Sequence, residues 1–208
     1  MNWTEAFDEL PLIAILRGIS PAEAVRVATL LVEAGFRLME VPLNSPDPLD
    51  SIAKIRAALE GRVLIGAGTV LKRDSVVQAS SAGAQFIVAP NADADVIAAT
   101  KDLDLVSVPA FSTPTEALVA IQAGADLLKL FPAEANSPPV LRSMRAVLPA
   151  TIKILPVGGI TPSNMQPYRD AGADGFGIGS ALYRPGKFID DIQASAASFI
   201  TAWRGSAS

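Results

Sequence analysis

The chain of 208 residues contains no cysteine and no histidine. Without cysteine there is no disulfide framework, no thiolate nucleophile and no Cys-ligated metal. Without histidine, the usual base near neutral pH and the commonest zinc ligand are both missing. A Ser-His-Asp hydrolase and a His-ligated zinc enzyme are therefore excluded. Acid and base chemistry must use carboxylates, lysine, tyrosine, water or a group of the substrate.

Long hydrophobic runs and basic clusters are also absent. Hydrophobic residues make up 50% of the chain, but charge, proline or glycine interrupts them before they reach the length that a bilayer requires. The first residues, Met1 to Trp3, show no basic segment of a signal peptide. We therefore expect a cytoplasmic protein with no membrane partner. The net charge of -4, without a Lys/Arg cluster, argues against nucleic acid as a partner and leaves a small anion as an open alternative.

Short apolar runs alternate with longer amphipathic segments along the whole chain. The predicted strands are 12–17, 38–43, 64–69, 86–91, 105–111, 127–131, 153–157 and 175–179. Ser-Pro or Thr-Pro, which favours a helix start, occurs at 20–21, 45–46, 113–114, 137–138 and 161–162. Ala-Gly, which is typical of a helix end, occurs at 34–35, 82–83, 123–124 and 171–172. The pattern is a repeated βα unit.

Eight such units predict an α/β protein with the (β/α)8 or TIM-barrel fold, in one domain over 1–208. An open, doubly wound sheet would show the same alternation. However, the turn after the first predicted strand lacks the Gly-x-Gly-x-x-Gly pattern that often accompanies that fold. We also expect a short helix, Trp3–Glu9, to cover the floor of the barrel.

In a (β/α)8 barrel the functional groups lie where the strands end, at their carboxyl termini. Polar or small residues occur at these positions in most of the predicted strands: Arg17, Glu40, Thr69, Asn91, Lys129, Gly158, Gly159, Gly179 and Ser180. A closed sheet would bring these residues together around one opening.

Lys129 lies inside the apolar run 127–131, Leu-Leu-Lys-Leu-Phe. Burial disfavours an ammonium group and lowers the lysine pKa from about 10.4, which increases the share of free amine that can attack a carbonyl. Lys129 is therefore a candidate Schiff-base nucleophile. The alternative is a lysine whose stem packs while its ammonium group reaches water. Lys153 begins its strand and is expected to face the floor instead.

Glu40 is a second charged residue within an apolar strand. Beside Lys129 it could act as a general acid and base, directly or through a water. The alternative is a structural ion pair with Arg17 or Lys129. Arg17 has two interpretations as well, since its guanidinium could bind a substrate carboxylate or phosphate or could neutralise Glu40.

Two glycine-rich strand ends predict a phosphate site. The segments are 157–161, Val-Gly-Gly-Ile-Thr, and 177–180, Gly-Ile-Gly-Ser. Barrels of this kind often bind phosphate at the last two strands through backbone N–H groups. The alternative is that the glycines serve only tight turns.

Taken together, six motifs resemble those of the class I aldolases that cleave 2-keto-3-deoxy-6-phosphosugar acids. The motifs are Ile-Leu-Arg-Gly at 15–18, Glu-Val-Pro-Leu-Asn-Ser at 40–45, Gly-Ala-Gly-Thr-Val at 66–70, Lys-Leu-Phe-Pro at 129–132, Val-Gly-Gly-Ile at 157–160 and Gly-Ser at 179–180. The family branch that acts on the gluconate epimer usually has arginine where this chain has Asn44, and threonine where it has Val157. The sequence therefore resembles the galactonate branch, in which Arg17 takes over recognition of the carboxylate.

The resemblance implies a mechanism and a site. Lys129 would form an iminium with the substrate and Glu40 would transfer protons, while Arg17 and Thr69 would hold the carboxylate. The remaining substrate contacts implied are Phe131, Val157, Gly158, Gly159, Gly179 and Ser180. The products would be pyruvate and D-glyceraldehyde 3-phosphate, with no metal or organic cofactor, and the family resemblance favours a homotrimer.

Three alternatives remain at this point. The first is an aldolase of the same family that acts on 2-dehydro-3-deoxy-6-phosphogluconate. The second is a barrel phosphosugar isomerase or epimerase with Glu40 as its base. The third is a sugar-phosphate binder without catalytic activity.

Overall fold

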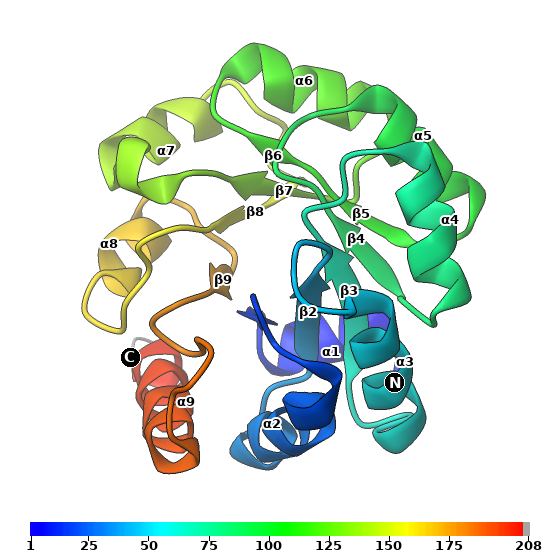
Figure 1. Ribbon diagram of the computed structural model, residues 1–208. Coiled ribbons are helices and arrows are strands. Elements are labelled where there is room, and N and C mark those ends of the chain that lie inside the picture. The colour runs from blue at the N-terminus through cyan, green and yellow to red at the C-terminus, as the bar shows by residue number, and fades with distance from the viewer. Residues whose placement is uncertain (206–208) are drawn as a thin grey trace.

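Parallel strands curve around a common axis and helices surround them in the computed structural model, which describes residues 1–205 (Figure 1). The strands are β1 Leu12–Ile15, β2 Leu38–Pro42, β3 Leu64–Gly68, β4 Phe86–Val88, β5 Val106–Val108, β6 Ala110–Phe111, β7 Leu127–Leu130, β8 Lys153–Pro156 and β9 Phe176–Ile178. The helices are α1 Trp3–Glu9, α2 Pro21–Ala34, α3 Pro48–Ala58, α4 Arg73–Ser81, α5 Ala94–Asp102, α6 Pro114–Gln122, η1 Ala133–Ala135, α7 Pro138–Arg145, α8 Met165–Asp170 and α9 Ile189–Arg204.

The strands form two parallel sheets, β5-β4-β3-β2-β1-β9 and β6-β7-β8, which close on each other. On one side the Lys129 N–H donates to Pro109 O at 2.8 Å, and the Asp126 N–H donates to Ser107 O at 3.1 Å. On the other side a bridge pairs Val157 with Gly177. Since β5 and β6 occupy one strand position, the fold is the predicted (β/α)8 barrel. The prediction of one domain over 1–208 stays a prediction, and 206–208 lie outside the described residues.

The predicted strand 105–111 is wrong in one respect, because the structure divides it into β5 and β6 at Pro109. Proline has no N–H group to donate to the strand ladder and often interrupts it. Several strands also end earlier than predicted. As a result, Arg17, Thr69 and Asn91 lie in the loops that follow β1, β3 and β4.

Helix starts were predicted correctly for α2, α6 and α7, but α3 begins two residues and α8 three residues after the expected proline. Ser45 does not cap α3 because its hydroxyl accepts a hydrogen bond from the Gly18 N–H at 2.9 Å. Thr161 belongs to a turn in which its N–H donates to Asn164 Oδ1 at 2.9 Å. The glycines expected to end four helices all have positive φ, from 97° to 119°.

Helix α1 closes the amino-terminal end of the barrel, as predicted for Trp3–Glu9. Phe7 is buried among the side chains that fill the barrel interior, and the Trp3 ring meets Phe86 edge to face at 5.2 Å between centroids. Lys153 Nζ lies 4.5 Å from the centre of the Phe7 ring. The predicted position of Lys153 at the floor is therefore confirmed.

The outer faces of the strands pack against the helices in a second, larger cluster of buried residues. Polar residues, rather than these two apolar clusters, occupy the carboxyl ends of the strands. No helix in the described part of the chain combines the length and the apolar character needed to cross a membrane.

Candidate active site

Lys129 and Glu40 lie together inside the barrel. Lys129 comes from β7 and is 6% exposed, and Glu40 comes from β2 and is 2% exposed. Both line one small interior space, whose boundary also includes Ile15 and Val157. The alternative in which the Lys129 ammonium group reaches water is wrong, because the barrel wall covers it.

Burial changes the proton affinity of both groups. Desolvation lowers the pKa of Lys129, and the charge of Arg17 lowers it further while Glu40 raises it. Desolvation raises the pKa of Glu40 to about 6, against the opposing effects of Lys129 and Arg17. The barrel thus holds an amine whose pKa is lowered by burial beside a carboxyl group whose pKa is raised to about 6.

Within the part of the chain that the structure describes, Glu40 is not engaged in a structural ion pair. Among residues 1–205, no ion pair within 4.0 Å joins its carboxylate to Lys129 or Arg17. Its Oε2 atom is buried without a hydrogen-bond partner in the same part of the chain. A buried carboxylate oxygen without a donor carries a desolvation penalty, and such groups are common where a protein reserves a contact for a ligand or water.

Gly68 makes room for this carboxylate. A Cβ atom at Gly68 would overlap Glu40 Oε2, because β2 and β3 are neighbours and Pro42 pairs with Gly68. The requirement for glycine therefore comes from a side chain on the adjacent strand.

Arg17 gathers two residues that lie far from it in sequence. Its Nη1 donates to Asn44 Oδ1 at 2.7 Å, and its Nη2 donates to Thr69 Oγ1 at 3.4 Å. Thr69 has a φ of 56°, a left-handed conformation that is uncommon for a β-branched residue and often found at functional sites. Arg17 thus bonds neutral groups and keeps its charge available to an anion.

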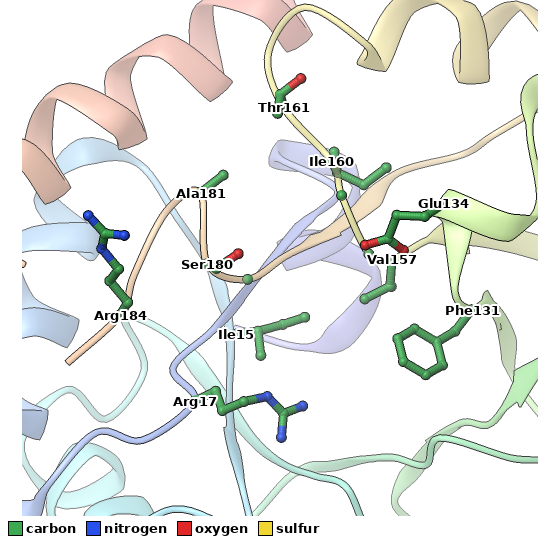
Figure 2. Close-up of a pocket in the computed structure, with 13 residues that line it drawn as sticks. Ile15, Arg17, Phe131, Glu134, Val157, Ile160, Thr161, Ser180, Ala181 and Arg184 are labelled. Carbon is green, nitrogen blue, oxygen red and sulfur yellow. The ribbon is translucent and has the colours of Figure 1, made fainter.

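A cavity of about 370 Å³ opens above the interior space at the carboxyl ends of the strands. Figure 2 shows side chains that line it, including Arg17, Phe131 and Ser180. The lining residues are Ile15, Arg17, Phe131, Glu134, Val157, Gly158, Gly159, Ile160, Thr161, Gly179, Ser180, Ala181 and Arg184. Most of the predicted substrate contacts are among them. Asn91 is not, and it is exposed elsewhere.

Phe131 connects the cavity to the buried amine. Its ring lines the cavity, and Lys129 Nζ lies 4.5 Å from the ring centre. Val157 connects them as well, since it borders both the cavity and the interior space. A substrate in the cavity would therefore meet Lys129 next to these two side chains.

The glycines after β8 and β9 have different roles. Gly158 and Gly159 have φ values of 107° and 62°, and a Cβ at Gly159 would lie 2.7 Å from Glu134 Cγ. At Gly179, no atom of residues 1–205 lies within 4 Å of where its Cβ would be. The first two are required by the turn and by packing, whereas Gly179 leaves open space beside the cavity.

Sequence reasoning missed Glu134 and Arg184. Glu134 lies in η1, and Arg184 lies in the loop after β9. Both are exposed charged residues outside the strands, where their residue type alone is unremarkable. The one signal available in the sequence was that each residue closely follows a motif: Glu134 comes after 129–132, and Arg184 comes after 179–180. Among residues 1–205, no group of three or more acidic side chains is arranged to hold a metal ion.

A buried lysine and a buried carboxyl group below a polar cavity, at the carboxyl end of a (β/α)8 barrel, are the features of a class I aldolase. The family model described as KDPG and KHG aldolase matches residues 4–196. The chain belongs to this family and is an aldehyde-lyase.

Known relatives agree with this assignment. The chain is 44% identical to the 2-dehydro-3-deoxy-6-phosphogalactonate aldolase of Escherichia coli K12, over 98% of both chains. It is 33% identical to the 2-dehydro-3-deoxy-phosphogluconate aldolase of Zymomonas mobilis, over 76% of this chain and 75% of that protein. A solved structure described as native KDPGal superposes with a TM-score of 0.94 at 43% identity, covering 95% of this chain and 96% of the other.

Proposed function

We propose that this aldolase cleaves 2-dehydro-3-deoxy-6-phosphogalactonate to pyruvate and D-glyceraldehyde 3-phosphate through a Schiff base on Lys129. The observation that carries the proposal is the shared burial of Lys129 and Glu40 beneath a cavity that contains Arg17. This arrangement supplies a nucleophilic amine, a proton carrier and a cation for the substrate carboxylate.

The reaction begins when the Lys129 amine adds to the C2 ketone and water leaves, which forms an iminium. Glu40, through a water, removes the proton of the C4 hydroxyl as the C3–C4 bond breaks. The electron pair of that bond moves into the iminium and forms an enamine, while C4 becomes the aldehyde of glyceraldehyde 3-phosphate. Glu40 returns a proton to C3, and water hydrolyses the new iminium to pyruvate and free Lys129. A pKa of about 6 suits Glu40 to both proton transfers.

Substrate binding follows the length of the cavity. Arg17, positioned by Asn44 and Thr69, binds the carboxylate of the substrate, and Phe131 and Val157 pack beside the imine. At the other end Gly158, Gly159, Gly179 and Ser180 bind the phosphate. No metal or organic cofactor takes part in these steps.

The preference for the galactonate epimer rests on Arg17 and Asn44. Asn44 occupies the position of the arginine typical of the gluconate branch, and it accepts a hydrogen bond from Arg17 at 2.7 Å. The higher identity to the relative named for the galactonate compound supports the same choice. The substrates are epimers at C4, so few contacts separate them. We further propose that the protein acts in the cytoplasm as a homotrimer.

Trapping with borohydride tests the mechanism. Incubation with pyruvate and borohydride should add one reduced pyruvyl group, which peptide mass spectrometry should locate on Lys129. Lys129→Ala should abolish the adduct, whereas the control Lys153→Ala should keep it, because Lys153 lies at the floor. A wild-type protein without an adduct would contradict the Schiff-base mechanism.

The substrate assignment needs a separate comparison. A lactate dehydrogenase assay for pyruvate, run on both C4 epimers, should give the higher kcat/KM for the galactonate compound. A clear advantage for the gluconate compound would reverse the assignment within the family and leave the mechanism standing.

A further inference from the structure

Arg184 is a cation on the rim of the cavity, without a side-chain partner in the described part of the chain. Within residues 1–205, its guanidinium has no hydrogen bond within 3.5 Å and no ion pair within 4.0 Å. Arg17, by contrast, is held by Asn44 and Thr69. Figure 2 shows Arg184 beside Ser180 and Ala181, on the opposite side of the lining residues from Glu134 and Phe131.

The backbone that carries Arg184 is firmly anchored. The N–H groups of Leu182 and Tyr183 donate to Gly179 O at 2.9 and 3.0 Å, and both side chains are buried. Lys187 Nζ donates to Leu182 O at 2.9 Å from the other side. The position of Arg184 is therefore tied to the strand end that borders the cavity, while its side chain is exposed.

The electrostatics of this end of the cavity require a cation if a phosphate binds there. A phosphate monoester carries a charge between -1.5 and -2 near neutral pH, as estimated for phosphorylated side chains. The glycine turn offers only the partial charges of its N–H groups, and Glu134 places a carboxylate directly against Gly158 and Gly159. Like charge on this wall opposes binding of a dianion. Arg184 lies across the cavity from Glu134 and supplies the opposite charge.

We propose that Arg184 binds the phosphate group of the substrate and thereby selects phosphorylated over unphosphorylated sugar acids. The guanidinium presents two parallel N–H donors, which match two phosphate oxygens. This inference rests on the proposed function for the identity of the substrate. It adds a charged side chain to a phosphate site that otherwise consists of backbone and one hydroxyl.

Arg184→Gln should lower kcat/KM for the phosphorylated substrate by about 10- to 100-fold, mainly through KM, the effect expected for loss of a charged hydrogen-bonded contact. The unphosphorylated analogue should react at the wild-type kcat/KM, because it never makes this contact. Arg184→Lys should recover part of the loss, since lysine keeps the charge but not the fork of donors. Arg62→Gln provides a matched control, because Arg62 is exposed just before β3 at the amino end of the barrel.

Direct binding separates this inference from the proposed function. sn-Glycerol 3-phosphate carries the phosphate ester but no ketone, so calorimetry can measure its binding without any aldol chemistry. Arg184→Gln should weaken that binding by a similar factor, and raised salt should reduce the difference from wild type. If wild type failed to cleave either epimer, the proposed function would fail and this titration would still decide the role of Arg184. Unchanged binding of glycerol 3-phosphate, or an equal loss of kcat/KM with and without the phosphate, would overturn the inference.

Discussion

Individual side chains in this barrel work in surroundings that disfavour their charged forms. Glu40 illustrates the cost, since its pKa rises from an ordinary 4.5 to about 6 on burial and its Oε2 lacks a hydrogen-bond donor in the described chain. The same burial favours the neutral amine of Lys129. Under the proposed mechanism, the reactivity of these two groups is obtained at the expense of stability.

The stability cost of Glu40 depends on pH. Because its folded pKa lies above the unfolded value, folding is favoured below pH 4.5, and this advantage is lost as the pH rises through about 6. The difference between these two pKa values corresponds to a change of about 2 kcal/mol in the free energy of unfolding. Glu40→Gln should therefore increase the free energy of unfolding at pH 8 by up to about 2 kcal/mol, and have little effect near pH 4. Urea unfolding at both pH values measures the difference.

The activity of Glu40→Gln and a control variant complete this test. The same Glu40→Gln variant should lose about 10²- to 10⁴-fold in kcat, as expected for removal of a general acid and base. Glu33→Gln is the control, since Glu33 is exposed on α2 and should change neither quantity. A variant that is less stable than wild type at pH 8 would show that the Glu40 carboxylate stabilises the fold.

At the scale of elements, the side chains of one element restrict which residues its neighbour can carry. These restrictions are not visible in the sequence of a single strand. Strand β3 must carry glycine at position 68 because β2 directs Glu40 into the same space. In the same way, the turn after β8 is compatible with Glu134 of η1 only because Gly158 and Gly159 lack side chains. The site is assembled from such pairs of elements.

Gly68→Ala should displace the Glu40 carboxylate. The added methyl group overlaps Oε2, and overpacking of a buried site costs about 1–3 kcal/mol. We expect a lower midpoint in urea together with a strong loss of kcat. Gly179→Ala is the comparison, because a Cβ there meets no atom of the described chain within 4 Å. It should keep the stability of wild type and raise KM for the phosphorylated substrate, and a Gly68→Ala variant with wild-type kcat would contradict the argument.

For the whole molecule, the two ends of the barrel have separate tasks. Helix α1 closes the amino end, where Phe7 is 3% exposed within the interior cluster. Lys129, Glu40 and the cavity lie toward the carboxyl end. In barrels of this type, the first end mainly serves stability and the second serves catalysis.

Phe7→Ala should destabilise the protein and leave its chemistry intact. Loss of a buried phenyl ring costs about 3–5 kcal/mol, which thermal or urea unfolding would detect. The kcat of the remaining folded protein should equal that of wild type, because the floor does not contact the cavity. Phe188→Ala is a matched control, since Phe188 is 78% exposed and its loss should change stability by less than about 0.5 kcal/mol. A large fall in kcat for Phe7→Ala would show that the two ends are coupled.

Much of the architecture could be predicted because it depends on local properties of the chain. The alternation of apolar runs and amphipathic segments predicted the barrel, and Trp3–Glu9 was placed correctly as a helix. Lys129 and Glu40 were identified as candidate site residues because a charged residue within an apolar strand can be recognised from the sequence alone. Each of these signals lies within a few consecutive residues.

Only the tertiary structure determined the features that depend on contacts between residues distant in sequence. Ser45 was expected to start a helix but instead accepts a hydrogen bond from Gly18. The need for glycine at position 68 comes from Glu40 on β2, and Arg184 gains its role only beside a cavity that other strands form. The sequence thus determined the strand and helix pattern and the presence of a buried amine and carboxyl group. The folded barrel determined their separation, their pKa values and the charges around the cavity, because these arise from contacts between distant residues.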